Sequence, residues 1–109
     1  MPALRDEQAL GALGALAHAA RLKTFRALVR AGDEGLSAGA IAGLLGMAPS
    51  SLSHHLSQLA QAGLARQERR HRTIIYRADY SAADALVAYL MENCCQGEEC
   101  APADAKDPK

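Results

Sequence analysis

The chain has 109 residues, of which half are hydrophobic but only 4% aromatic, and its formal net charge is zero. This length allows one small domain with a modest core, and the charged residues at positions 5–7 exclude the apolar start of a signal peptide. The longest apolar run, residues 9–17, is about half of what a membrane span needs, so we expect a cytoplasmic protein with no membrane partner.

The first part of the chain predicts three helices. The first, over residues 3–18, carries at roughly helical spacing the apolar side chains of Leu4, Leu10, Leu13 and Leu16. The second ends at Gly32 and carries Leu22, Phe25, Leu28 and Val29. Ser37 is a suitable N-cap for the third, whose apolar side chains are Ile41, Leu44 and Leu45. Packing of these stripes against one another indicates a mainly α fold.

A fourth helix follows a tight turn at Gly46 and Met47, because Pro49 fits a first helical position. Three leucines at positions i, i+4 and i+7 form its buried face, namely Leu52, Leu56 and Leu59. Gly63 is expected to end this helix as a left-handed cap.

Two extended segments, residues 64–69 and 73–78, predict a small β-hairpin joined by Arg-His-Arg. A last helix begins near Ser81 and stops at Gly97, with one stripe formed by Val87, Leu90, Met91 and Cys94. We expect one domain over residues 1–97 and a flexible acidic tail over residues 98–109 that carries the third cysteine.

Charge is distributed unevenly along the chain. Residues 64–78 carry five arginines against Glu68, a local charge of +4. Residues 79–109 carry seven acidic residues against two lysines, a local charge of −5. A basic segment in a neutral chain indicates a surface for a polyanion such as nucleic acid, although such segments also occur as solvated faces.

Two short helices joined by a glycine-containing turn and followed by a basic hairpin have the layout of a winged helix-turn-helix. In this layout the second helix, called the recognition helix, places its N-terminal end in the major groove of double-stranded DNA. With the leucines inward, the polar residues left for base and phosphate contacts are Ser50, Ser51, Ser53, His54, His55 and Gln58. The hairpin would contribute phosphate or minor-groove contacts from Arg69, Arg70 and Arg72. Adjacent histidines also occur as metal ligands or as surface residues without a role.

The stretch SSLSHHLSQLAQAGLARQERRHRTIIYRA resembles the ArsR/SmtB family of metal-responsive repressors, and the likeness extends from ALAHAARLKTFRALVRAG to the last helix. It implies a homodimer held by the first and last helices, which binds a near-palindromic operator and leaves it when an effector binds. The hairpin departs from the family pattern, because ERRHRT has no glycine at the tip.

All three cysteines lie in the segment CCQGEEC, residues 94–100. The cysteine pair that many family members carry before the recognition helix is absent from SAGAIAGLLG, and the zinc-sensing site of other members lacks its histidine here. Cys94 and Cys95 project from the same helix end, and Gly97 would let Cys100 approach them. Three thiolates form a soft donor set that suits three-coordinate As(III) or Sb(III).

We therefore predict an arsenite- or antimonite-responsive regulator with metal ligands Cys94, Cys95 and Cys100 and no organic cofactor. The double cysteine after Glu-Asn is similar to the arsenite-responsive branch of the family. Another soft metal and a disulfide redox switch stay open as alternatives. An enzyme is disfavoured because there is no Cys-x-x-Cys motif, and a metal scavenger would leave the recognition helix without a role.

Overall fold

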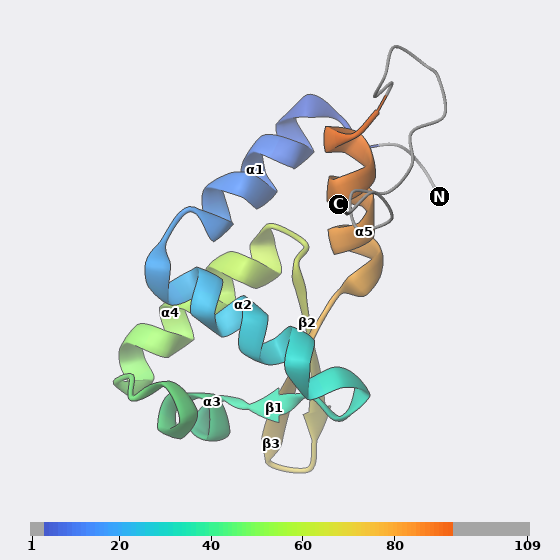
Figure 1. Ribbon diagram of the computed structural model, residues 1–109. Coiled ribbons are helices and arrows are strands. Elements are labelled where there is room, and N and C mark those ends of the chain that lie inside the picture. The colour runs from blue at the N-terminus through green and yellow to red at the C-terminus, as the bar shows by residue number, and fades with distance from the viewer. Residues whose placement is uncertain (1–3, 93–109) are drawn as a thin grey trace, which may run out of the picture.

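The computed structural model describes residues 4–92 and confirms the mainly helical winged helix-turn-helix fold (Figure 1). The elements in chain order are α1 (Asp6–Leu16), α2 (Ala19–Ala31), the 3-10 helix η1 (Gly32–Glu34), β1 (Leu36–Ser37), α3 (Ala38–Leu45), α4 (Pro49–Gln61), β2 (Ala65–Arg70), β3 (Thr73–Ala78) and α5 (Tyr80–Leu90). The predicted boundary at residue 97 and the tail 98–109 lie outside the described residues. No helix within residues 4–92 is long and apolar enough to cross a membrane.

The sheet has three antiparallel strands in the order β1-β3-β2, rather than the two strands of the predicted hairpin. β1 pairs with β3 through Leu36 and Tyr76. Gly35 makes this approach possible, because its φ is +67° and a Cβ there would lie 2.6 Å from the Tyr76 carbonyl oxygen. A strand of two residues is too short to show an alternating pattern in the sequence.

The core lies where α2, α3 and α4 pack against one another, with β2 at its edge. Its most deeply buried apolar side chains are Leu28, Ile41, Leu52, Leu56, Leu59 and Leu64. The predicted face of α4 is therefore confirmed. The predicted cap of α3 is confirmed as well, since the Ser37 hydroxyl accepts a hydrogen bond from the Ala40 N–H.

The first predicted helix is confirmed as α1, but its four leucines do not form its most deeply buried face, and Leu4 and Leu16 are only partly buried against the core. α1 instead turns Ala9, Ala12 and Ala15 inward, while Leu10 and Leu13 are exposed. α1 spans Asp6–Leu16 rather than residues 3–18. Its small alanines let the helix lie close to α2, α4 and α5.

The apolar stripes of α2, α3 and α5 are only partly buried. α5 ends at Leu90 and not at Gly97 as predicted, and it buries Leu86 while Val87, Leu90 and Met91 of the predicted apolar stripe are exposed. Three members of the predicted apolar stripes of α2 and α3 are exposed as well, namely Leu22, Val29 and Leu44. The apolar sides of α1 and α5 thus extend outward, beyond what the core of one subunit covers.

Candidate nucleic-acid interface

The N-terminal end of α4 presents short polar side chains to solvent. Gly46 ends α3 in a left-handed conformation and the chain re-enters a helix at Pro49. Because the leucine face of α4 is buried, the residues exposed at this end are Ser50, Ser51, Ser53 and His54. These hydroxyl and imidazole groups can donate and accept hydrogen bonds toward base edges and phosphates.

Two further residues predicted to contact DNA are half-buried. Gln58 is partly covered on α4, and His55 lies against the start of α2. The His55 ring centroid is 4.7 Å from that of His18, and its Nδ1 is 3.5 Å from a guanidinium nitrogen of Arg21. Burial lowers the pKa of His55, and the neighbouring His18, Arg21 and His54 lower it further.

The β2–β3 hairpin forms the wing, and its two faces carry different residues. Ala65 and Ala78 are buried at its base, so alternation along β2 places Gln67 and Arg69 on the face toward α4. Glu68 and Arg70 lie on the opposite face. The predicted wing residues Arg69, Arg70 and Arg72 are all exposed.

One acidic residue modifies the basic character of the wing. Glu68 accepts a 2.6 Å hydrogen bond from Arg77 and lies 3.8 Å from the Arg70 guanidinium. The bond from Arg77 lowers the pKa of Glu68, so this carboxylate stays ionised. Within residues 4–92 neither Arg69 nor Arg72 is paired with a carboxylate, which leaves those two cations available to a polyanion.

The wing tip closes without glycine. Arg70 pairs with Thr73, so His71 and Arg72 form a two-residue loop. His71 has a φ of 55°, in the left-handed region where glycine is usual and histidine is tolerated better than most residues. The conformation costs about 1–2 kcal/mol relative to ordinary backbone. His71 thus takes the left-handed position at the tip that a glycine would occupy in the family pattern.

A shallow hollow of 380 Å³ separates the outward side of α4 from the wing. Its polar lining residues are Ser53, Ser57, Gln61, Gln67 and Tyr76. The recognition helix α4 and the wing therefore share a hollow that is lined mostly by hydroxyl and amide groups, with Leu56 and Ala60 among them. Such a surface suits the edge of a duplex, where the helix enters a groove and the wing meets the adjacent backbone.

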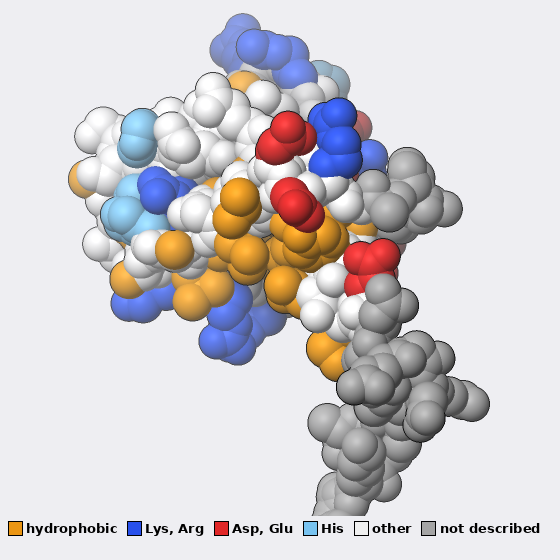
Figure 2. Space-filling view, turned by 90° about the horizontal axis from the view of Figure 1, so that it is seen from above, with side chains coloured by type: hydrophobic (Ala, Val, Ile, Leu, Met, Phe, Trp, Pro, Cys, Tyr) orange, Lys and Arg blue, Asp and Glu red, His pale blue; other side chains and the backbone are white. Residues whose placement is uncertain are grey.

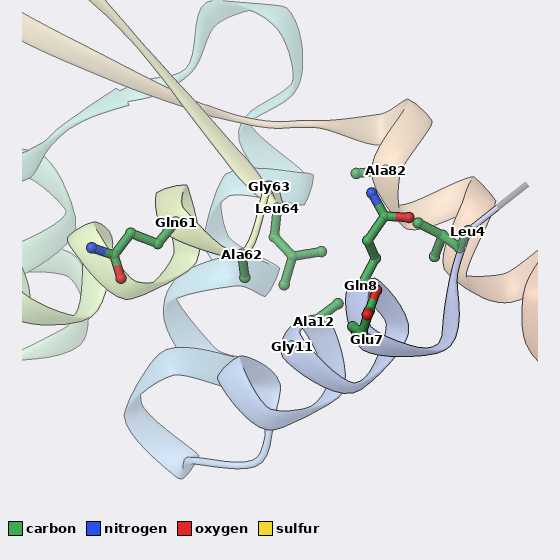
Figure 3. A pocket seen from close by; sticks show the side chains of 10 residues that line it. All are labelled: Leu4, Glu7, Gln8, Gly11, Ala12, Gln61, Ala62, Gly63, Leu64 and Ala82. Atoms are coloured by element: carbon green, nitrogen blue, oxygen red, sulfur yellow. The ribbon is translucent and has the colours of Figure 1, made fainter. Parts of the chain in front are cut away.

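A second hollow, of 420 Å³, lies between α1, the end of α4 and the start of α5 (Figure 3). Figure 3 shows Leu4, Glu7 and Gln8 on one side of it and Ala62 and Leu64 on the other. Most of these groups are apolar or small, and the Gln8 amide oxygen is used within α1 by the Arg5 N–H at 2.8 Å. This hollow belongs to the α1–α5 side of the domain, away from the polar end of α4.

The predicted metal ligands Cys94, Cys95 and Cys100 lie outside the described residues. Within residues 4–92 no group of three or more histidine, cysteine, aspartate or glutamate side chains could hold a metal ion. Two residues that the sequence interpretation missed, His18 and Arg21, contact His55 across more than thirty positions of chain. No local sequence pattern predicts a contact between residues that far apart in the chain.

Comparison with known proteins agrees with this geometry. Residues 16–68 match a family described as a helix-turn-helix domain. The HTH-type transcriptional regulator YgaV of Escherichia coli K12 is 33% identical over 82% of this chain and 88% of its own length. The ArsR family transcriptional regulator RHA00566 superposes with a TM-score of 0.73 at 25% identity, covering 92% of this chain and all of the other. The chain belongs to the ArsR-like family of winged helix-turn-helix regulators.

This ArsR-like regulator is also similar to AntR, an antimony-specific transcriptional repressor. The two chains are 28% identical with a TM-score of 0.58, over 79% of this chain and 78% of AntR. The predictions of a DNA-binding regulator and of a protein that is not an enzyme are confirmed by these family relationships. The effector of this ArsR-like regulator is a separate question.

Proposed function

We propose that this ArsR-like regulator is a homodimeric repressor, which binds a near-palindromic operator and leaves it when three cysteines bind As(III) or Sb(III). The observation that carries the DNA-binding half is the exposed polar end of α4, held beside a wing with two arginines that pair with no carboxylate of residues 4–92. The effector half rests on the three clustered cysteines of the sequence and on the similarity to an antimony-specific repressor.

In the proposed complex the N-terminal end of α4 enters the major groove. Ser50, Ser51 and Ser53 can hydrogen-bond phosphates or base edges, and His54 and Gln58 can read a base that offers both a donor and an acceptor. Arg69 and Arg72 of the wing then meet the neighbouring backbone, with Arg70 held partly by Glu68. His55 contributes beside the start of α2, where it lies against Arg21.

The outward apolar sides of α1 and α5 support a dimer through these helices. α1 and α5 contact each other, and both expose large apolar side chains, namely Leu10, Leu13, Val87, Leu90 and Met91. Figure 2 shows hydrophobic side chains gathered in the middle of the face above α1 and α5. A second copy that covers this surface would remove it from water, and contiguous apolar patches of this kind mark interfaces.

The cysteines connect to this interface through the chain. α5 ends at Leu90, four residues before Cys94, so a metalloid bound by the three thiols would draw residues 94–100 together directly after a helix of the proposed dimer interface. Two half-sites of an operator lie about 34–36 Å apart for each helical turn, so a small shift between the two α4 helices weakens binding at both. The coupling is reciprocal, and DNA must weaken metalloid binding by the same factor.

The test is fluorescence anisotropy of a labelled upstream-promoter duplex with the reduced full-length protein. Arsenite, antimonite, zinc and diamide are titrated separately into the complex. We expect release by arsenite or antimonite near one equivalent per site and none by zinc or diamide. Cys100→Ser should keep operator affinity and lose the response, whereas Glu98→Gln, in the same segment, should keep both.

The outcomes separate the two halves of the proposal. Release by diamide alone, reversed by dithiothreitol, would replace the metalloid site by a disulfide switch. Normal arsenite release from the Cys100→Ser variant would remove Cys100 from the ligand set. Failure of the wild-type protein to bind any upstream duplex would overturn the DNA-binding half.

A further inference from the structure

Three of the four histidines gather with one arginine where the start of α2 lies against α4. The rings of His18 and His55 are 4.7 Å apart between centroids, and those of His54 and His55 are 5.8 Å apart. Arg21 joins the group, because a guanidinium nitrogen lies 3.5 Å from His55 Nδ1. Its Nε donates a 2.8 Å hydrogen bond to the Ala15 carbonyl, which ties the guanidinium to the last turn of α1.

This cluster brings together positive or protonatable groups, and no acid of the described part of the chain balances them. The charged groups that act on His55 are His18 and Arg21 from α2 and His54 from α4, and no carboxylate of residues 4–92 joins them. α3 has no titratable side chain, and the acids of α1 stand in its first turn, at the far end from Ala15. Figure 2 shows histidines gathered around a Lys or Arg side chain at the left edge of the view, where no acidic side chain appears.

The hydrogen bonds already present define which atoms are free. His18 Nδ1 accepts a 3.2 Å hydrogen bond from the Ala20 N–H and caps α2. The Nε2 of the same ring therefore carries the N–H that can donate a hydrogen bond to a ligand. The Arg21 guanidinium keeps N–H groups beyond the one bound to Ala15. His54, one residue from His55, is exposed at the same end of α4 as the serines. An anion bound here would accept several hydrogen bonds, and no carboxylate of residues 4–92 in the cluster would repel it.

We propose that His18, Arg21 and His55 form a binding site for one DNA backbone phosphate beside the reading end of α4, and that operator binding takes up a proton there. The proposal rests on the proposed DNA-binding function and adds a contact and a pH dependence to it. On binding, the Arg21 guanidinium turns N–H groups to the phosphate. The freed Nδ1 of His55 takes a proton from solvent.

The sign of the pH effect follows from the cluster in the free protein. Because burial and the neighbouring cations lower the pKa of His55, this imidazole is neutral near pH 7 without DNA. A phosphate beside it stabilises the protonated form, so the operator affinity rises as the pH falls. One proton taken up limits the gain to tenfold per pH unit, and with a rise of about one unit in the pKa of His55 we expect about a three- to fivefold gain between about pH 7.5 and pH 6.

The first experiment measures the dissociation constant of an operator duplex across this pH range at constant ionic strength. The operator affinity of the wild-type protein should rise by this factor as the pH falls, and that of His55→Gln should depend less on pH. His71→Asn is the matched control, since it replaces an exposed histidine of the wing by asparagine, which tolerates the positive φ of 55°. An unchanged pH slope in His55→Gln, or an equal flattening in His71→Asn, would overturn the proposal.

A second experiment keeps the wild-type side chains and follows the His55 ring by NMR. The pKa of His55 should rise by about one unit when operator duplex is added, as expected for an imidazole beside a phosphate. His18→Asn, which retains an N-cap for α2, should reduce this rise, whereas His71→Asn should not.

Inorganic phosphate without DNA serves as the second arm of the NMR experiment. A rise with duplex and none with millimolar phosphate supports a site for the DNA backbone. A rise with free phosphate alone, or no rise with duplex that is demonstrably bound, refutes the proposal. A protein that binds no duplex at any pH instead refutes the proposed function, so the two failures are distinguishable.

Discussion

Leu10 is the most exposed of the large apolar side chains in residues 4–92, with 68% of its surface accessible on α1. Burying a whole leucine contributes about 2 kcal/mol, so covering that fraction in a dimer would contribute about 1.4 kcal/mol per subunit. A twofold axis repeats the contact, which makes about 3 kcal/mol per dimer. Leu10→Ser should therefore raise the dimer dissociation constant by about 100-fold.

Sedimentation equilibrium over a range of protein concentrations measures this constant. Leu44→Ser is the matched control, because Leu44 is 66% exposed but lies on α3, outside the α1–α5 surface. We expect the control to dimerise like the wild type and both variants to keep the helical circular dichroism spectrum. A Leu10→Ser dimer of unchanged strength, or an equal loss in Leu44→Ser, would refute dimerisation through this surface.

Two further predictions concern the stability of the subunit. Gly35→Ala should lower the free energy of unfolding by about 2–4 kcal/mol, because the new Cβ meets the Tyr76 carbonyl at a φ of +67°. Gly43→Ala, in an open helical position, should raise it by up to about 1 kcal/mol. Urea unfolding compares the two, and equal stabilities would contradict the role of Gly35. Asp79→Ala should cost about 1 kcal/mol at pH 7, since the carboxylate caps α5 through the Ala82 N–H. Desolvation alone would raise the pKa of Asp79, but hydrogen bonds to its carboxylate outweigh it and leave the pKa lowered. The contribution is thus present at neutral pH and lost as the pH falls below about 4, where wild type and variant should converge in urea unfolding. A gap that persists at about pH 2 would show that the cap does not depend on the carboxylate charge.

The helices were predictable from the sequence because each depends on residues within a few positions of one another. In α4, Leu52, Leu56 and Leu59 recur at helical spacing, and the subunit itself buries the face they form. Pro49 at the start and Gly63 beyond the end act through their own backbone conformations. The polar end of α4 followed directly, since the residues between the leucines have to point outward.

The faces of α1 and α5 were not predictable in the same way. α1 has apolar residues all around, and its alanines pack inside the subunit while Leu10 and Leu13 point outward. Periodicity reveals that a helix has apolar sides, but which of them a subunit covers depends on how closely its neighbours approach. Leu10 and Leu13 point outward and support the dimer through the first and last helices that the family resemblance implied.

The sequence alone thus determined the order of the helices, the position of the wing and the polar end of α4, because local spacing and turn residues encode them. Only the tertiary structure decided that β1 joins the sheet beside Tyr76, that α1 packs by its alanines, and that His18 and Arg21 meet His55. These are contacts between residues far apart in the chain. They exist because the core of α2 and α4 brings those segments together, and no property of either segment by itself requires it.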